Sequence, residues 1–333
     1  MLILGIETSC DETSVSIVED GTKLVVNEVF TQKVHEKYGG VVPEVASRNH
    51  IIKIFEVLNA AFNRSNLKLS DIDLVAVTQG PGLLGALLVG LNTAKTLSYI
   101  LNIPLIPVNH IEAHLFANIL THDKINPPFL GIIVSGGHTT LVEVKDYHKY
   151  KLVGETLDDA IGESFDKVSK MLGLGYPGGP IIDKLAKKGN PDMYNFPRPV
   201  IKNNFYDFSF SGLKSAVRRF LKEKNSYNKA DVAASFQKAA VESVTMRVKK
   251  YITEKRKVPL VMAGGVAANS LLRFKIKEIS TENNIDYYYP PLKLCTDNGA
   301  MIASLGYFLF KKNGPLNQED VLKLNAKARM DIV

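Results

Sequence analysis

Two histidines stand four residues apart in the segment NHIEAH, residues 109–114. On a helix, residues four apart lie on one face with their Cβ atoms roughly 5–6 Å apart, so His110 and His114 can share a metal ion. A lone pair of this spacing is more often structural. Here both histidines directly follow PLIPV, a segment typical of a parallel strand, and ligand sites gather at the ends of such strands. His110 and His114 are therefore candidate metal ligands.

The position of the nearby glutamate argues against a zinc metalloprotease. Those enzymes use the pattern H-E-x-x-H, in which the glutamate is the catalytic base. In this chain the glutamate is Glu112, two residues after His110. At about 100° per residue, Glu112 lies roughly 200° around the helix and cannot reach a water on a shared metal.

A two-histidine metal site needs a third ligand, for which Asp297 in LCTDNGAM is the strongest candidate. The alternative role of Asp297 is to cap the helix that follows, because Asp or Asn beside Gly is a normal N-cap. Two imidazoles and one carboxylate leave open coordination positions and suit Fe²⁺, Zn²⁺ or Mn²⁺. The sequence alone does not separate these metals.

Three carboxylates, Glu7, Asp11 and Glu12, lie in or beside the loop TSCDET. Carboxylates repel phosphate, so they serve a metal, a proton or a basic partner, or they cap a turn. We expect Asp11 and Glu12 to be catalytic, with Asp11 orienting or deprotonating the attacking nucleophile. Cys10 is expected to be a small buried residue rather than a nucleophile.

The segments around these residues alternate between strand and helix, which predicts an α/β fold. The chain also repeats itself: LGIETSCDETSVSIV (4–18) aligns with LGIIVSGGHTTLVEV (130–144), each a strand, a small polar loop and a strand. We therefore predict two similar halves that face each other across a ligand cleft. The first comprises 1–108 with 298–333, and the second comprises 109–297 with a helical insertion at about 155–250.

Composition and charge are those of an ordinary globular protein with a basic excess. The chain has 333 residues, is 45% hydrophobic and carries a net charge of +7, which is compatible with a polyanionic partner. Two cysteines distant in sequence and no signal peptide predict a cytoplasmic protein. Residues 82–101 are apolar enough to span a membrane, but they contain Asn92, Lys95 and three glycines, so a buried helix is expected and no membrane partner.

Nine motifs, in order over about residues 3–306, resemble the TsaD family of tRNA N6-adenosine threonylcarbamoyltransferases. They are GIETSCDET, YGGVVPEVASRNH, QGPGLLGALLVG, NHIEAH, IVSGGHT, GESFDKVSKMLGLGYPGGP, FSFSGLK, MAGGVAAN and CTDNGAM. The SGGHT segment is similar to the bacterial type. The resemblance implies an actin-like ATPase fold, a duplicated ribonuclease H-like α/β architecture with a ligand cleft between two lobes.

The resemblance also assigns site residues. It implies metal ligands at His110, His114 and Asp297. It implies substrate-binding positions at Ile133, Val134, Ser135, Gly136, Gly137, His138, Asp166, Gly179, Asp183 and Asn269.

Each substrate-binding motif also has an ordinary structural reading. SGG is small enough to admit a phosphate but is also a plain hairpin turn, and GYPGGP is also a simple tight turn. A lone helical aspartate such as Asp166 is usually exposed. GGVAAN, with Asn269 as the polar contact of an adenosine, is also a Gly-rich strand end.

The implied reaction moves a threonylcarbamoyl group from threonylcarbamoyl-AMP to N6 of adenosine 37 in tRNAs reading ANN codons, releasing AMP. The implied cofactors are one divalent metal, Fe²⁺ before Zn²⁺, and an adenine nucleotide or threonylcarbamoyl-AMP in the cleft. The implied partners are tRNA, a degenerate paralogue of the TsaB type and a small P-loop ATPase of the TsaE type. A homodimer through the apolar helix at residues 83–101 is a further expectation, drawn from the sequence itself. KSAVRRFLKEK (214–224), with Lys214, Arg218 and Arg219, is a candidate tRNA contact or a solvated basic face.

Two other functions stay open at this point. A small-molecule kinase or ATPase of the same fold would transfer phosphoryl groups and would not need the histidine pair. A non-enzymatic scaffold is disfavoured, because the histidines, Asp297 and the glycine loops are all present.

Overall fold

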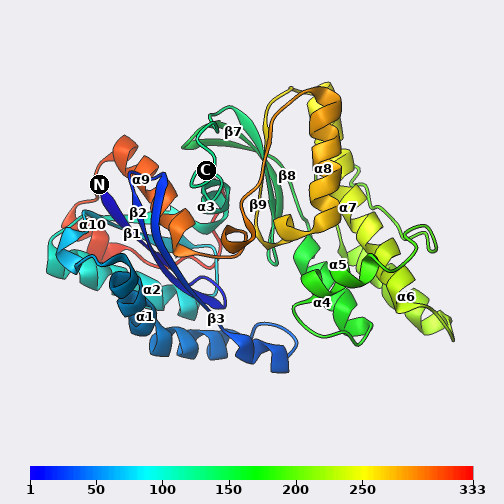
Figure 1. Cartoon of the computed structure of the whole chain (residues 1–333), viewed down its shortest axis with the longest axis horizontal. Coiled ribbons are helices and arrows are strands. Elements are labelled where there is room, and N and C mark those ends of the chain that lie inside the picture. Colours follow the sequence, from blue (N-terminus) through cyan, green and yellow to red (C-terminus); the bar gives the residue numbers. More distant parts are fainter. Residues whose placement is uncertain (333) are drawn as a thin grey trace. The chain divides into compact units, whose positions relative to one another are not determined.

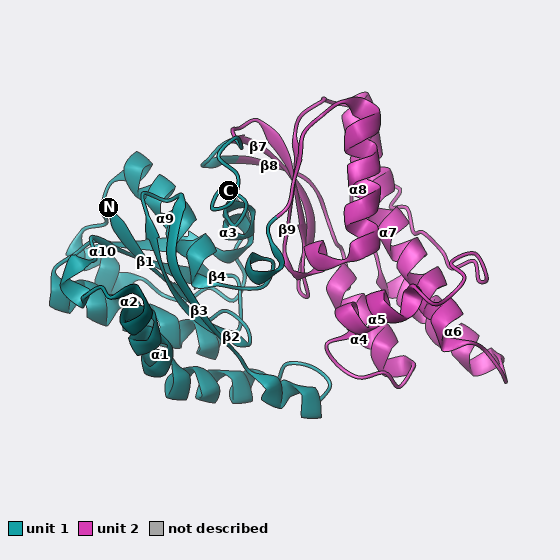
Figure 2. Cartoon of the chain, viewed as in Figure 1, with its two compact units in different colours: residues 1–125, 146–149, 290–333 teal, residues 126–145, 150–289 magenta. Residues whose placement is uncertain are grey.

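The computed structural model describes residues 1–332, which divide into two compact units (Figure 2). Unit 1 comprises Met1–Ile125, Asp146–Lys149 and Pro290–Val333, and unit 2 comprises Asn126–Lys145 and Tyr150–Tyr289. The boundaries predicted after residues 108 and 297 differ from this division. Helix α3 (His110–Phe116) belongs to unit 1 because it packs against helix α9 (Gly299–Asn313), where the ring of Phe116 lies 5.5 Å from that of Phe308.

A five-stranded mixed sheet forms the centre of unit 1. Its strand order is β3 (Lys23–Thr31), β2 (Glu12–Glu19), β1 (Leu2–Glu7), β4 (Leu74–Gly80) and β5 (Leu105–Asn109). The first three strands are antiparallel, and β4 and β5 continue parallel to β1. Helices α1 (Pro43–Ser65) and α2 (Leu84–Leu101) cover one face and α9 the other (Figure 1). Almost every residue of β1, β2 and β4 is therefore buried.

The sheet of unit 2 has the same topology, which confirms the predicted duplication. Its order is β10 (Tyr287–Tyr288), β9 (Leu260–Ala263), β6 (Phe129–Val134), β7 (Thr139–Asp146) and β8 (Lys149–Glu155). The register agrees with the sequence alignment as well. Ile6 pairs with Val15 in unit 1, and the aligned residues Ile132 and Leu141 pair in unit 2.

Helices make up much of the rest of unit 2. They are α4 (Ile161–Met171), α5 (Gly178–Ala186), α6 (Ser211–Glu223), α7 (Lys229–Glu254) and α8 (Ser270–Asn283). The first four lie in the region where a helical insertion is predicted. The side chain of Arg247, buried in α7, ties the loop before α6 to this layer by donating hydrogen bonds to the carbonyls of Pro199 and Asp207.

Helix α2 is the one helix in the described residues with the length and composition of a membrane span. One of its faces packs into the core of unit 1 through residues such as Leu87, Leu91 and Ala94. Helix α2 is therefore a core helix, as the sequence predicts, although Leu84, Tyr99 and Ile100 remain exposed on its other side.

The basic C-terminal segment KLNAKARM (323–330) is expected from its composition to be a solvated tail, but the backbone of residues 325–331 is bound to unit 1. The amide of Lys327 donates to the carbonyl of Gln79, and the carbonyl of Ala328 accepts from the amide of Gly82. The carbonyl of Asp331 accepts a hydrogen bond of 2.8 Å from the side chain of Asn109. The segment thus runs along the end of β4 and reaches the first turn of α3.

Ending the chain after Leu324 should therefore lower the free energy of unfolding by about 2–4 kcal/mol, because each lost hydrogen bond contributes about 1 kcal/mol. Urea denaturation measures this change. Lys327→Ala, which leaves the backbone bonds in place, should stay within about 0.5 kcal/mol of the full chain. Equal midpoints for the full and the shortened chain would show that the segment contributes nothing.

Candidate metal centre and ligand loops

The two histidines lie on the first turns of α3, directly after β5. Asn109 ends the strand and caps the helix, since its side-chain oxygen accepts hydrogen bonds from the amides of Ile111 and Glu112. This cap fixes where the helix begins and therefore which face His110 and His114 share. Their ring centroids are 4.7 Å apart.

Asp297 comes to the same place from the other end of unit 1. Its Oδ1 lies 3.6 Å from Nε2 of His110 and 3.3 Å from Nε2 of His114. The alternative expectation, that Asp297 caps α9, is wrong, because the cap is the neighbouring Asn298, whose side chain accepts from the amide of Met301. The carboxylate of Asp297 is thus directed to the histidines.

Among the residues that the structure describes, His110, His114 and Asp297 form a group that could hold a metal ion. Their ligand atoms all lie within 4.8 Å of one another. His114 is completely buried, and neither of its ring nitrogens has a hydrogen-bond partner. A buried polar atom without a partner costs about 1–3 kcal/mol. A cation bound by Nε2 would remove part of this cost, so the donor set fits a metal. Glu112 is not part of the group.

The electrostatics of the centre also favour a cation. Burial alone lowers the pKa of His110, but the carboxylates of Asp297 and Glu7 outweigh it and raise the pKa to about 9. Burial, followed by the charges of Asp297 and Asp11, raises the pKa of Glu12 well above its ordinary value. A proton on His110 and a metal ion would both offset the charge of the carboxylates, so they compete for this centre.

The loop between β1 and β2 carries the two predicted catalytic residues. Asp11 lies in the loop, and its backbone carbonyl accepts a hydrogen bond from the amide of Gln32. Glu12 begins β2 and is half-buried. Burial raises the pKa of the Cys10 thiol well above its ordinary value, which disfavours the thiolate and agrees with the expectation that Cys10 is not a nucleophile.

Sequence reasoning missed the histidine that holds this loop in place. His50 of α1 is buried, and its Nε2 lies 2.9 Å from the carbonyl oxygen of Cys10. Its Nδ1 lies 2.8 Å from the hydroxyl of Thr13. Nε2 therefore carries the proton and Nδ1 accepts from the hydroxyl. His50 lies in one of the motifs shared with the family, YGGVVPEVASRNH, but nothing in the sequence indicates its hydrogen-bond partners.

In unit 2, the segment 133–138 forms the end of β6 and the turn to β7. The side chains of Ile133 and Val134 are in the core, so only their backbone is available to a ligand. Ser135 closes the turn: its amide donates to the carbonyl of His138, and its hydroxyl accepts from the amide of His138. A Cβ added at Gly136 or Gly137 would meet no atom within 4 Å. Both glycines are therefore open on the side where a side chain would point, while Gly162 of α4 packs against the backbone of Ser135 and Gly136 on another side.

The remaining predicted residues are linked to one another in unit 2. Asp166 of α4 accepts a hydrogen bond of 2.7 Å from the amide of Gly178, directly before Gly179, whose own surroundings are open. Asp183 of α5 accepts from the hydroxyl of Ser270 at 2.8 Å.

The residue before Ser270 is Asn269, which caps α8 through its side-chain oxygen. Its side-chain nitrogen donates to Gln237 at 2.9 Å. Asp166 thus adjoins Gly179, and Asp183 adjoins Asn269.

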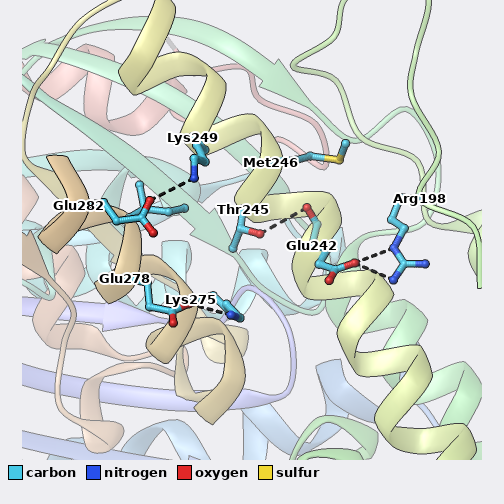
Figure 3. A pocket seen from close by; sticks show the side chains of 9 residues that line it. Arg198, Glu242, Thr245, Met246, Lys249, Lys275, Glu278 and Glu282 are labelled. Carbon is cyan, nitrogen blue, oxygen red and sulfur yellow. Dashed lines mark hydrogen bonds and ion pairs between the residues drawn. The ribbon is translucent and has the colours of Figure 1, made fainter. Parts of the chain in front are cut away.

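A groove of about 450 Å³ between α7 and α8 is a separate feature of unit 2 (Figure 3). Its walls carry the ion pairs Arg198–Glu242, Lys249–Glu282 and Lys275–Glu278. Because the charges of the groove are paired with one another, we assign no ligand to it. It contains none of the predicted site residues.

Comparison with solved structures establishes the fold. Full-length HypF in its phosphate- and nucleotide-bound form matches with a TM-score of 0.63 and 14% identity, over 95% of this chain and 47% of that chain. Component A of the (R)-2-hydroxyglutaryl-CoA dehydratase of Acidaminococcus fermentans matches with a TM-score of 0.55 and 15% identity, over 92% of this chain and 98% of that one. The predicted actin-like ATPase fold is therefore confirmed.

Comparison with known sequences establishes the family. A family model described as tRNA N6-adenosine threonylcarbamoyltransferase matches residues 23–304. Proteins of that name from Clostridioides difficile and Thermosipho africanus are 53% and 51% identical over 315 residues, which is 93% and 94% of this chain and 93% and 95% of theirs. The chain belongs to the tRNA N6-adenosine threonylcarbamoyltransferase family, a family of transferases that modify tRNA.

Proposed function

We propose that the chain transfers the threonylcarbamoyl group from threonylcarbamoyl-AMP to N6 of adenosine 37 in tRNAs that read ANN codons. A bond forms between N6 and the carbamoyl carbon, the bond from that carbon to the phosphate oxygen breaks, and N6 loses a proton. AMP leaves with the electron pair. The observation that carries the proposal, beyond family membership, is the buried group of His110, His114 and Asp297.

These three residues would hold one divalent metal, and we propose Fe²⁺, with Zn²⁺ as the alternative. When bound, such a metal supplies a Lewis acid that draws charge from oxygen atoms of the donor. The turn at Ser135–Gly137, with Gly179, Asp183 and Asn269, would bind the adenylate. Backbone amides beside glycine approach phosphate closely, and the carboxylate of Asp183 can accept from ribose hydroxyls.

The acceptor sets the main demand on the protein, because the lone pair of the adenine N6 amine is delocalised into the ring. The protein can compensate for this weak nucleophilicity by holding N6 in position against the activated carbonyl carbon of the donor. We propose that Asp11 orients the amine or accepts its proton. Glu12, whose pKa is raised by burial, would be the second catalytic carboxyl group beside Asp11.

Unit 2 carries the basic excess of the chain, since unit 1 has slightly more acidic than basic residues. We propose that tRNA contacts helix α6 of this unit. Lys214 is engaged with Asp159, whereas Arg218 and Arg219 are exposed. They are the better candidates for phosphate contacts.

The protein partners remain those that the family resemblance implies: a degenerate TsaB-type paralogue and a small TsaE-type P-loop ATPase, with a homodimer as the alternative. Exposed apolar residues on α1 (Ile51, Ile52 and Phe55) and on α2 (Tyr99 and Ile100) offer a surface for such a partner. We infer a cytoplasmic location, in keeping with two free cysteines.

The direct test supplies threonylcarbamoyl-AMP and an ANN-decoding tRNA transcript to the metal-loaded protein, with and without partners. Nucleoside analysis should show the modified adenosine, and AMP should appear in equal amount. A transcript with guanosine at position 37 is the matched control and should stay unmodified. AMP release without modification of any tRNA, or phosphoryl transfer from ATP to a small molecule instead, would contradict the proposal.

Arg218→Glu should weaken tRNA binding and make the plot of log affinity against log salt concentration shallower by about 1, because one phosphate contact is lost. Filter binding over a range of salt concentrations measures both quantities. Lys68→Glu makes the same charge change at an exposed site in unit 1 and should change neither. Equal effects of the two variants would exclude a specific contact at α6.

His114→Leu should abolish metal binding but lower the free energy of unfolding of the metal-free protein by less than about 1 kcal/mol, because the ring has no hydrogen bonds to lose. The matched control is His50→Leu, which loses two contacts of an equally buried ring and should cost about 2–4 kcal/mol while metal content stays unchanged. Metal analysis and urea denaturation supply the two readouts. Retained metal in His114→Leu would refute the assignment.

A further inference from the structure

The side chain of Glu7 touches one of the two histidines of the metal centre from behind. Glu7 is the last residue of β1 and is completely buried. Its Oε2 lies 2.9 Å from Nδ1 of His110, the ring nitrogen that faces away from Asp297. The two residues are 103 positions apart in the sequence and meet because β1 and β5 both flank β4 and end at the same edge of the sheet.

The other contacts of Glu7 fix this carboxylate in one orientation. The hydroxyl of Thr78, at the end of β4, donates to Oε2 at 2.6 Å, and the amide of Ser9 donates to Oε1. A carboxylate that receives hydrogen bonds at both oxygens acts as an acceptor toward the imidazole as well. The hydroxyl of Ser9 also lies 3.2 Å from Nδ1 of His110, but Oε2 of Glu7 is closer, at 2.9 Å, and can only accept. Nδ1 of His110 therefore carries a proton, and Nε2 is the nitrogen left for a metal.

His110 and His114 differ in this respect. Nδ1 of His114 has no hydrogen-bond partner, so no polar group supports that ring on the side away from Asp297. In a metal-binding histidine, the N–H of the ring nitrogen that does not bind the metal normally donates a hydrogen bond to a carboxylate, a carbonyl or a water. This contact orients the ring and raises its basicity. Of these two histidines, His110 receives that support from a carboxylate, Glu7.

We propose that Glu7 is a positioning residue that selects Nε2 of His110 as the metal ligand, with Thr78 and Ser9 holding Glu7 in place. This inference rests on the proposed metal at His110, His114 and Asp297. Glu7 does not reach the metal or the substrate itself; it acts through the ring of His110.

Glu7→Gln should weaken Zn²⁺ binding by about 10–100-fold, the usual effect of removing such a partner. In glutamine, an NH₂ donor replaces one of the two carboxylate oxygens. In one orientation this donor faces the amide of Ser9, and in the other it faces the hydroxyl of Thr78 and Nδ1 of His110, all of which are donors as well. Glu7→Asp keeps the charge but shortens the side chain, and should lose affinity as well. Competition with a chromophoric chelator measures the affinities, and Ser16→Ala is the matched control.

Ser16 lies in the same sheet, is equally buried and donates one hydrogen bond, to Asn27. Its variant should bind Zn²⁺ within about twofold of the natural chain. Thermal unfolding of the metal-free proteins separates loss of affinity from loss of folding. If Glu7→Gln does not fold, Thr78→Val, which frees Oε2, should still weaken binding several-fold.

A second readout is independent of activity and of affinity. In the Zn²⁺-loaded protein labelled with ¹⁵N-histidine, long-range ¹H–¹⁵N spectra should show His110 protonated at Nδ1 and bound through Nε2. In Glu7→Gln this Nδ1 proton should exchange faster with water or disappear.

The outcomes separate this inference from the proposed metal site. Unchanged Zn²⁺ affinity in a folded Glu7→Gln variant would overturn the role of Glu7 and leave the metal site standing. Full affinity in Glu7→Asp would show that charge rather than position matters, and would overturn it too. If the natural chain binds no Zn²⁺ or Fe²⁺ at all, both the inference and the proposed metal site fail.

Discussion

The metal centre of unit 1 is governed by one constraint. Imidazole rings and carboxylates are buried together there, and the negative charge of the carboxylates requires a balancing positive charge. His114 is enclosed with no hydrogen-bond partner for its ring, and the carboxylate of Asp297 faces it. Such a cluster costs free energy unless protons or a metal balance it. The fold places these groups together, because the ends of β1 and β5 and the start of α9 all meet at one edge of the sheet.

The two units show how one topology can be adapted to different chemistry. In both, an antiparallel hairpin carries a serine at the equivalent place, Ser9 in unit 1 and Ser135 in unit 2. The loop of unit 1 is occupied by its own protein groups: Glu7 takes the amide of Ser9, and Gly82 approaches the backbone of Ser9 so closely that a Cβ would clash. In unit 2, Gly162 of α4 approaches the backbone of Ser135 and Gly136 just as closely, although a Cβ at Gly136 or Gly137 would meet no atom. The two loops therefore differ in their side chains: Asp11 and Glu12 in unit 1 stand where unit 2 has Gly137 and His138.

Sequence patterns predicted the features that follow from local periodicity and from repetition. The α/β class, the duplicated hairpins and the core position of α2 follow from strand and helix patterns and from the aligned segments 4–18 and 130–144. The grouping of His110 and His114 follows from helical spacing. The choice of Asp297 rested on the motif that contains it, and the structure brings it to the histidines.

Features that depend on tertiary packing could not be predicted in this way. Asp297 and Asn298 are both good capping residues, and only the path of the chain into α9 decides that Asn298 caps the helix. The unit boundary moves because α3 packs on α9. Residues 325–331 have the composition of a solvated tail, but their hydrogen bonds use the backbone, which composition does not describe. The carboxylate behind His110 comes from 103 residues away.

X-ray absorption spectroscopy at the metal edge of the purified, metal-loaded protein tests the central claim most directly. The account predicts two imidazole nitrogens in the first coordination shell, at about 2.0–2.1 Å if the metal is zinc, with oxygen ligands and no sulfur. His114→Leu, which should bind no metal, should give no metal-edge signal under the same conditions. A shell that contains sulfur, or a spectrum without imidazole scattering, would contradict the assignment of His110, His114 and Asp297 as the metal ligands.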